Sequence, residues 1–375
     1  MAAKNPDRFQ VAALAGGSNL RLLAEQAVAT RAPAVGAAHP DVDALRDAIH
    51  ARALAAGTTG YEPELFAGPE AASAIAAWSG ADVVLNGITG SIGLAPTLAA
   101  LGAGHLLALA NKESLIVGGA LVKDAAAPGQ LVPVDSEHSA LAQALRAGGA
   151  EEVERLVVTA SGGPFRGRAR AELARVTPAE ALAHPTWDMG KVVTTNSATM
   201  VNKALEVIEA HLLFDIPLDR IDAVVHPQSV VHSMVEFIDG STIAQASPPD
   251  MRLPIALGMA WPARVPGACA PCDWRSAASW TFEPLDEDAF PAIRLAKDAA
   301  AASETHMAVF NAANEEAVEA FHNGRIGFLN IVDTVAATVE DYDAGAVAGA
   351  GLTLEAVLAA EDWARNRARE RLGLL

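Results

Sequence analysis

Residues 81–113, ADVVLNGITGSIGLAPTLAALGAGHLLALANKE, alternate short apolar runs with a helical segment. The runs 81–85 and 105–110 are short and almost continuously apolar, which is typical of strands buried on both faces. A glycine-rich turn and a helix through Leu101 join them. Strand–helix–strand alternation of this kind predicts parallel strands and an α/β fold.

The same alternation continues on both sides of this segment. Further strands are expected at 10–15 and 131–134, and a helix at 19–30. We therefore predict a doubly wound, Rossmann-like N-terminal domain over residues 1–134. The first strand, glycine loop and helix of such a domain are missing, because residues 4–9 resemble the end of a helix that leads into a strand.

The pattern changes after about Glu152. Two strand segments, 223–237 and 242–246, flank an Asp239-Gly240 turn, which predicts a hairpin. With a strand at 155–160 and an amphipathic helix at 196–213, they predict an α+β catalytic domain. We expect this domain over residues 135–260, a linker over 261–287 and a C-terminal helical domain over 288–375, with the proline-rich segment 248–271 as a connecting stretch.

Charge and composition exclude several classes of protein. Lys and Arg number 27 against 45 Asp and Glu, so the formal net charge is −18. Nucleic-acid binders and proteins of anionic membrane surfaces need a basic face, so neither partner is expected. The longest uncharged stretch, 83–111, contains Pro96 and several glycines, unlike a spanning helix. No apolar secretory segment opens the chain, and we expect a cytoplasmic protein.

Two carboxylates follow the strand at 131–134. In an extended segment, Asp135 and Glu137 point to the same face, where they repel each other unless a cation binds them. Oxygen-only ligands suit Mg²⁺ or Mn²⁺. The alternative is a solvated strand end, because this pair of acids is common in proteins.

The helix at 196–213 carries a second candidate site. Asn196 or Ser197 is a suitable N-cap, and Ser197 with Lys203 would bind a phosphate at the helix N-terminus. Glu206 lies about 5 Å further along the axis, a separation that fits a short sugar phosphate bound to a metal. The alternative is a surface helix with an intrahelical Lys–Glu pair.

Three loops are candidates for a cofactor site and a lid. The turn 16–19 after the first strand has no acid, and Arg21 follows, which favours NADP over NAD. The glycines of 87–93 allow a ligand to approach the backbone closely. In the loop 184–190, Trp187 would lie on a lid that excludes water. The alternatives are ordinary turns and a tryptophan anchored in the core.

Taken together, these segments resemble the 1-deoxy-D-xylulose 5-phosphate reductoisomerase family, and the resemblance spans essentially the whole chain. Eight motifs occur in family order: 110–115 ANKESL, 133–138 PVDSEH, 161–165 SGGPF, 184–190 HPTWDMG, 197–203 SATMVNK, 226–234 HPQSVVHSM, 249–252 PDMR and 311–315 NAANE. The resemblance implies an NADPH-dependent enzyme that rearranges and reduces its sugar phosphate substrate to 2-C-methyl-D-erythritol 4-phosphate. It also implies a homodimer.

The resemblance further implies a role for each matching residue. Mg²⁺ or Mn²⁺ would be held by Asp135, Glu137 and Glu206. The substrate phosphate would be bound by Ser161, Ser197, Asn202 and Lys203, and its sugar by Lys112, Ser136 and His184, with Trp187 on the lid. The catalytic residues would be Lys112, Glu137, His184 and Glu206. The NADPH site would be lined by Gly17, Ser18, Asn19, Asn111, Glu113 and Gly190.

The sequence departs from the family in three places. Its first strand and the G-x-T-G-S-I-G loop are missing, and we expect in-frame codons upstream to encode them. Asn196 stands where the family usually has Asp, and Ser18 replaces a basic residue of some members. Two alternatives follow from the missing loop: a descendant that binds sugar phosphate and metal but transfers no hydride, and an isomerase without reduction.

Overall fold

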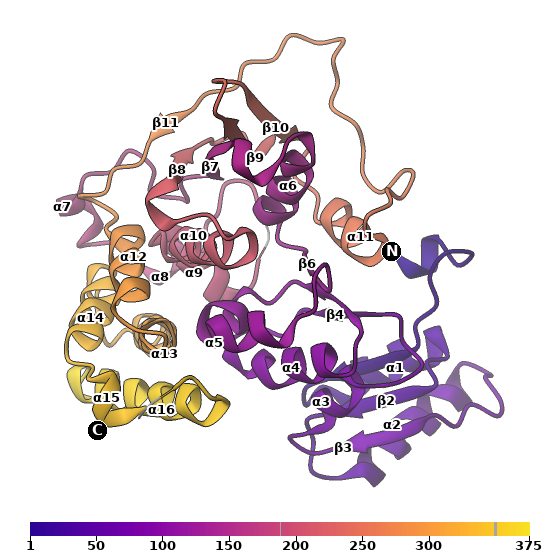
Figure 1. Cartoon of the computed structure of the whole chain (residues 1–375). Coiled ribbons are helices and arrows are strands. Elements are labelled where there is room, and N and C mark those ends of the chain that lie inside the picture. Colours follow the sequence, from indigo (N-terminus) through magenta and orange to yellow (C-terminus); the bar gives the residue numbers. More distant parts are fainter. Residues whose placement is uncertain (188, 349–350) are drawn as a thin grey trace.

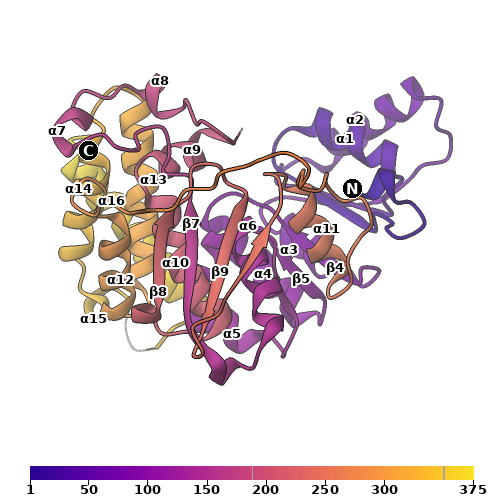
Figure 2. The same cartoon turned by 90° about the horizontal axis from the view of Figure 1, so that it is seen from above.

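The computed structural model describes residues 1–187, 189–348 and 351–375 and confirms the predicted α/β fold (Figure 1). Two parallel three-stranded sheets come first, then a five-stranded mixed sheet, then a group of helices. Seen from above, the five-stranded sheet stands between the C-terminal helices and the N-terminal α/β region (Figure 2).

The first sheet has the order β1-β2-β3, with all strands parallel. Its elements are β1 (Ala13–Gly16), α1 (Leu20–Thr30), β2 (Ala34–Ala37), α2 (Val42–Ala55), β3 (Glu64–Ala67) and α3 (Ala71–Ala76). Helices α1 and α2 pack together over buried Leu23, Val28, Leu45 and Ile49. Asn19 caps α1, as its side chain accepts a hydrogen bond from the Leu22 amide at 3.1 Å.

The second sheet has the order β4-β5-β6, again parallel. Its elements are β4 (Val83–Asn86), α4 (Leu94–Gly102), β5 (Leu106–Leu109), α5 (Lys112–Ala125) and β6 (Leu131–Pro133). Parallel strands joined by helices, as in both sheets, are typical of a doubly wound fold. Within the described residues, however, no hydrogen-bonded ladder joins β1 to β4.

The five-stranded sheet has the order β10-β9-β7-β8-β11. Its strands are β7 (Val153–Ala160), β8 (Ile221–Val225), β9 (Val231–Phe237), β10 (Thr242–Ala246) and β11 (Glu283–Pro284). The predicted hairpin at Asp239-Gly240 is confirmed, with Gly240 at φ +84°. The segment 223–237, expected to be extended throughout, is interrupted at 226–230, where the chain turns from parallel β8 into antiparallel β9.

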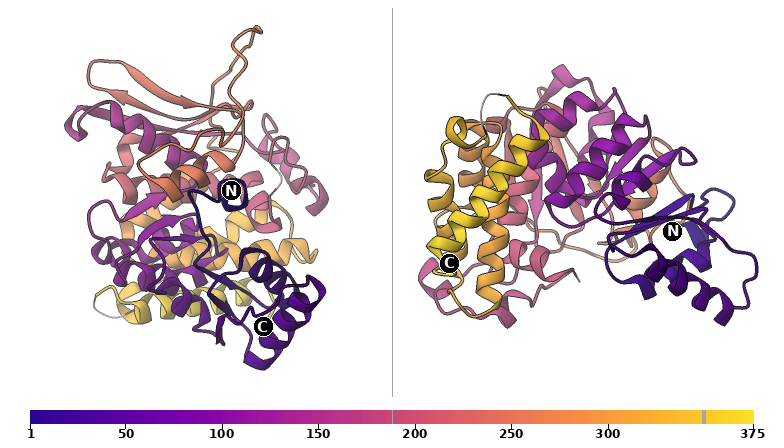
Figure 3. Two further views of the ribbon diagram at one scale, coloured as in Figure 1. Left: turned by 90° about the vertical axis from the view of Figure 1, so that its right-hand side faces the viewer. Right: turned by 90° about the horizontal axis from the view of Figure 1, so that it is seen from below.

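Helix α5 is the centre of the largest core cluster. It packs against α4, against α10 (Val201–Phe214) and against α13 (His306–His322), so it joins all three parts of the chain. The C-terminal helices stack beside it (Figure 3): α12 (Ala292–Ala302), α13, α14 (Leu329–Glu340), α15 (Ala344–Val347) and α16 (Leu354–Arg371). Phe310 of α13 is fully buried, and truncating such a side chain to Ala costs about 3–5 kcal/mol.

Two local predictions at the candidate site are wrong. The helix expected at 196–213 is two helices, α9 (Lys191–Ala198) and α10, because Met200 adopts a left-handed conformation with φ +63°. Ser197 therefore lies in the last turn of α9 and caps nothing. Asp135 and Glu137 are not on an extended strand, because α6 (Ser136–Ala144) begins directly after β6, with Asp135 as its N-cap.

The proline-rich stretch contains a further helix, α11 (Arg252–Ala260), which was expected to be irregular. Pro254 lies in its first turn, where a missing amide hydrogen costs nothing. The helix packs on the second sheet, and Met1 and Phe9 pack on the helix. Short helices α7 (Arg170–Leu173) and α8 (Pro178–Ala181) follow β7. The division of the chain at residues 134, 260 and 287 stays a prediction.

Candidate active site

A cavity of about 260 Å³ lies where the carboxyl ends of β4, β5 and β6 face α10. This is the edge of a parallel sheet at which α/β proteins bind their ligands. The cavity is lined by most of the predicted site residues: Lys112, Glu113, Asp135, Ser136, Glu137, Ser161, His184, Trp187, Ser197, Asn202, Lys203 and Glu206. The fold therefore brings together residues from separate segments, as their predicted roles require.

Three carboxylates form the centre of the site. Asp135 and Glu137 come from the start of α6, and Glu206 reaches them from the middle of α10. One oxygen of each carboxylate lies within 4.8 Å of the others. A cluster of oxygen ligands alone fits Mg²⁺ or Mn²⁺ rather than Zn²⁺. The predicted metal ligands are therefore adjacent, although a cap and not a strand places the first two.

Two lysines pair with these acids, Lys203 buried and Lys112 partly buried. Lys112 contacts Asp135 and lies 2.8 Å from Oε1 of Glu206, while Lys203 lies 2.7 Å from Oε1 of Glu137 and contacts Glu206 as well. Burial disfavours the charged form of both lysines, but the carboxylates outweigh it and raise the pKa of each. Three carboxylates and two ammonium groups leave one net negative charge, which favours a divalent cation.

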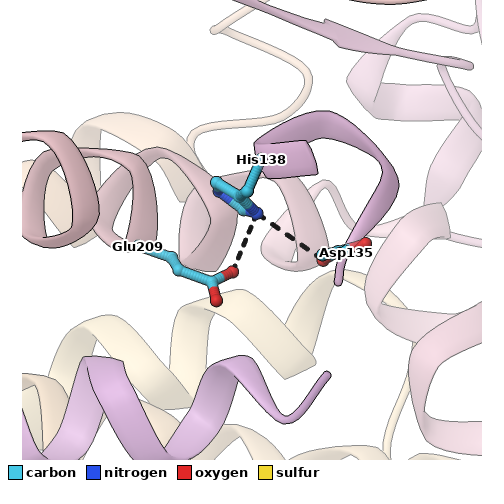
Figure 4. A group of neighbouring side chains, drawn as sticks. All are labelled: Asp135, His138 and Glu209. Atoms are coloured by element: carbon cyan, nitrogen blue, oxygen red, sulfur yellow. Dashed lines mark ion pairs between the residues drawn. The ribbon is translucent and has the colours of Figure 1, made fainter. Parts of the chain in front are cut away.

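A second ion pair lies behind the carboxylates (Figure 4). His138 Nδ1 is 3.0 Å from Oε2 of Glu209 and 4.0 Å from Oδ2 of Asp135, and its Nε2 is 2.8 Å from the carbonyl oxygen of Glu206. Burial lowers the pKa of His138, yet the Glu209 carboxylate outweighs it and raises the value to about 9. This pair was not predicted from the sequence, where its one indication is that each residue lies one helical turn from a predicted metal ligand.

Ser161 and His184 form a hydrogen-bonded unit on another wall of the cavity. His184 Nδ1 accepts hydrogen bonds from the amides of Thr186 (3.1 Å) and Trp187 (2.9 Å). Its proton is therefore on Nε2, which donates to Ser161 Oγ at 3.0 Å. Since Ser161 Oγ also accepts from the Gly163 amide at 3.2 Å, its own hydrogen is left to donate to an anion in the cavity.

Trp187 closes the same side of the cavity. Its indole nitrogen lies 3.4 Å from Ser229 Oγ, and its ring centroid is 6.4 Å from that of His232. Ser229 lines the cavity and adopts φ +49°. No role was predicted for Ser229 from the sequence, although it lies in the motif 226–234. Its signal was a hydroxyl in the turn between two strands, where polar ligand contacts are frequent.

Comparison with known protein families identifies the family of this chain. Residues 1–119 match the family model of 1-deoxy-D-xylulose 5-phosphate reductoisomerase, residues 131–214 the model of its C-terminal domain, and residues 246–367 the model described as the DXP reductoisomerase C-terminal domain. The chain belongs to the 1-deoxy-D-xylulose 5-phosphate reductoisomerase family. The resemblance inferred from the eight motifs is thereby confirmed.

Curated relatives and solved structures of the reductoisomerase family match along the whole chain. The enzyme of Paenarthrobacter aurescens (strain TC1) is 69% identical over 368 residues, which are 98% of this chain and 92% of the relative. The Zymomonas mobilis reductoisomerase in complex with NADPH superposes with a TM-score of 0.89 at 40% identity, covering 100% of this chain and 94% of that one. A DOX-P reductoisomerase in complex with NADPH, fosmidomycin and magnesium gives 0.88 at 35% identity, with the same coverage.

The residues predicted to bind the reductoisomerase cofactor are more dispersed. Glu113 lines the cavity, whereas Gly17, Ser18, Asn19, Asn111 and Gly190 are not among its lining residues. Asn111 instead holds the turn 87–93, because its side-chain amide donates to the carbonyl oxygens of Ile88 (2.5 Å) and Gly90 (3.0 Å). That turn brings Gly87, Ile88 and Thr89 to the cavity, three positions for which no individual role was predicted.

Acid pH is expected to release Trp187 in this member of the reductoisomerase family. Burial lowers the pKa of His184 below its ordinary 6.5, so the imidazole is neutral at about pH 7. Protonation would turn Nδ1 into a donor facing the amides of Thr186 and Trp187. Because the folded-state pKa is lowered, the contact is fully present above the unfolded value and is lost as the pH falls through the lowered one.

The measurement is the fluorescence of Trp187, taken as wild type minus Trp187→Phe, from about pH 8 to about pH 5. The difference signal should change on the acid side of the ordinary histidine pKa. A His184→Gln variant should show no such transition, because the amide does not titrate. A transition of equal size in that variant would assign the change to another group.

Proposed function

We infer that this protein catalyses the NADPH-dependent conversion of 1-deoxy-D-xylulose 5-phosphate to 2-C-methyl-D-erythritol 4-phosphate. The observation that carries the inference is the cavity itself, in which three carboxylates and two lysines adjoin the backbone turn at the end of β4. The sugar skeleton first rearranges to an aldehyde of the same composition. Hydride from NADPH and one proton then reduce this aldehyde to the alcohol.

The carboxylates of Asp135, Glu137 and Glu206 would hold Mg²⁺ or Mn²⁺. The bound cation supplies Lewis-acid polarisation of the substrate ketone and the neighbouring hydroxyl. Lys112 Nζ lies against two of these carboxylates and 3.1 Å from Asn202 Oδ1, so it is placed to donate to a substrate oxygen at the metal. Asn202 in turn donates to Glu206 Oε1 at 2.5 Å and orients that ligand.

The substrate phosphate is assigned to the wall formed by Ser161, Ser197, Asn202 and Lys203. Ser161 offers its hydroxyl hydrogen. Lys203 offers a positive charge, because its carboxylate partners raise the pKa of its amino group and keep that group protonated. Ser136 and His184 are assigned to the sugar. Trp187 is assigned to excluding water from the reacting carbons, since it covers the cavity beside Ser229.

NADPH is the second substrate of the proposed reaction. We assign its site to the carboxyl edge of the two parallel sheets, with Gly17, Ser18 and Asn19 after β1 and Asn111, Glu113 and Gly190 nearer the cavity. Gly17 fits this role, because nothing lies within 4 Å of the position where a side chain would begin, which leaves room for a ligand against the backbone. The descendant without hydride transfer is not favoured.

The test is the loss of NADPH absorbance when the protein is mixed with 1-deoxy-D-xylulose 5-phosphate and Mg²⁺. We expect one product alcohol per NADPH consumed and no turnover once the metal has been removed with a chelator. Activity should return when Mg²⁺ or Mn²⁺ is added back. Accumulation of the aldehyde with no NADPH consumed would favour an isomerase without reduction, and binding without turnover would favour the non-catalytic descendant.

We also propose that the protein acts as a homodimer in the cytoplasm, where NADPH is available. Support for the dimer comes from the edge strand β10, where Ile243 is exposed and Ile238 of the adjoining turn is 65% exposed. A second copy would cover these apolar side chains. Among the described residues, no helix combines the length and apolar character needed to cross a bilayer. Sedimentation analysis of the full chain tests the dimer.

A further inference from the structure

The segment Asn311–Glu315 of α13 has no role in the proposed chemistry, although it is one of the eight motifs. It lies in the C-terminal helices, and none of its residues lines the cavity. Asn311 and Asn314 are nonetheless buried, and buried amides need specific partners. Asn314 bonds to Asn196, which precedes the lining residue Ser197, and Asn311 bonds to Glu315, which packs against the turn 87–93.

On the phosphate side, Asn314 bonds to α9. Its side-chain amide donates to Asn196 Oδ1 at 2.9 Å, and both side chains are almost fully buried. Asn196 directly precedes Ser197, one of the proposed phosphate ligands. The backbone of Ser197 packs tightly against Gly163, because a side-chain carbon added at Gly163 would lie only 2.8 Å from the Ser197 carbonyl oxygen. A displacement of Asn196 therefore displaces Ser197.

On the cofactor side, Glu315 lies against the turn 87–93. A side-chain carbon added at Gly90 would lie 3.2 Å from Glu315 Oε1, so the carboxylate is packed directly on the turn. Gly90 has φ +85° and ψ 175°, a conformation that essentially only glycine adopts. The turn is thus held between the Asn111 amide and the Glu315 carboxylate.

Glu315 is itself fixed by two donors. Asn311 Nδ2 donates to its Oε1 at 3.0 Å, and Arg365 of α16 donates to its Oε2 at 2.6 Å. The adjoining Glu316 pairs with the same Arg365 at 3.4 Å and with Arg369 at 2.8 Å. Among the described residues, Glu316 makes no hydrogen bond or ion pair to the turn 87–93, and Glu315 alone of the two acids lies within 4 Å of a side-chain carbon added at Gly90. This difference between the two acids can be tested.

We propose that Asn314 and Glu315 are positioning residues that set the affinities for the two substrates separately. Asn314 places the phosphate wall through Asn196, and Glu315, held by Arg365, places the turn that faces the cofactor. This rests on the proposed function, because it assigns the phosphate to Ser197 and NADPH to the side of the turn. The C-terminal helices thereby take part in substrate binding without touching either substrate.

The test is a comparison of Asn314→Leu with Glu315→Ala in the full chain. A lost positioning hydrogen bond is worth about tenfold in affinity. We therefore expect Asn314→Leu to raise the KM for the sugar phosphate by that factor with the KM for NADPH unchanged. Glu315→Ala should raise the KM for NADPH by that factor and leave the KM for the sugar phosphate unchanged. The matched control Glu316→Ala, which removes comparable ion pairs from the same helix, should change neither KM.

Separate binding titrations with NADPH and with the sugar phosphate make the comparison independent of turnover. A wild-type protein that binds both but consumes no NADPH would contradict the proposed function, and the titrations would still test the positioning roles. Equal losses of both affinities in both variants, or a Glu316→Ala variant that behaves like Glu315→Ala, would overturn the proposal. If either variant does not fold, Asn314→Asp and Glu315→Gln keep the side-chain shape and take its place.

Discussion

Replacing Glu206 by Gln is expected to lower kcat/KM by about a thousandfold, since the loss of one ionised metal ligand removes roughly 4 kcal/mol of transition-state stabilisation. Glu206 is 1% exposed and is the one proposed metal ligand that α10 contributes. It also accepts hydrogen bonds from both Lys112 and Lys203. With Gln at position 206, the two remaining carboxylates would bind the cation more weakly. The ammonium groups of Lys112 and Lys203 would each lose a charged partner.

Mn²⁺ binding, followed by electron paramagnetic resonance, measures the metal directly. We expect the Glu206→Gln variant to bind Mn²⁺ much more weakly than the wild type, with NADPH binding retained. The control is Asp333→Asn, which makes the same chemical change in an exposed ion pair with Arg170 and should alter neither quantity. Unchanged Mn²⁺ affinity in Glu206→Gln would remove this residue from the metal site.

Regular elements with a clear period could be predicted from the sequence. The strands β4, β5 and β6 and the helix between the first two follow from apolar runs separated by turn residues, and the structure has them within a few residues of the expected bounds. The hairpin at Asp239-Gly240 was predictable because its turn chemistry is local. In each case the information lies within about a dozen residues of sequence.

The break between α9 and α10 could not be predicted in this way. Residues 191–214 contain no glycine or proline, and Met200 takes a left-handed conformation that residues other than glycine seldom adopt. Met200 is 2% exposed and belongs to a cluster with Phe165 and Phe290. Tertiary packing therefore outweighs the local helical preference, and the resulting bend places Ser197 and Lys203 on the same cavity.

The site residues likewise divide into those whose roles could be predicted from local sequence and those whose positions depend on tertiary packing. Asp135 and Glu137 were recognisable as carboxylates after a strand, but their geometry depends on Asp135 capping α6. Contacts of high sequence separation, such as Lys203 with Glu137, become visible only once α10 packs beside α6. The His138–Glu209 pair was missed for the same reason, since the two residues are far apart in the sequence and meet only where α10 packs beside α6. The proposed metal ligands could be named from the motif resemblance, whereas His138 and Glu209 behind them became evident only from the fold.

Replacing Lys203 by Met is expected to destabilise the metal-free protein by about 3–5 kcal/mol, the usual cost of removing one partner from a buried ion pair. Lys203 is 4% exposed and is the cation that Glu137 contacts. Without it, Glu137 and Glu206 repel each other in a buried site. The variant should also lose about a thousandfold in kcat/KM, because the proposed phosphate site loses its buried charge and the metal ligands lose their positioning.

The response of the Tm to Mg²⁺ distinguishes the loss of the Lys203 charge from a simple packing defect. A divalent cation neutralises the carboxylates that Lys203 leaves behind, so Mg²⁺ should raise the Tm of Lys203→Met by more than it raises the Tm of the wild type. Lys297→Met is the control, because Lys297 donates to the Ile221 carbonyl oxygen away from the cavity. Its Mg²⁺ shift should equal that of the wild type. An equal shift in Lys203→Met would mean that the lysine and the metal do not serve the same carboxylates, and that Lys203 acts on the phosphate alone.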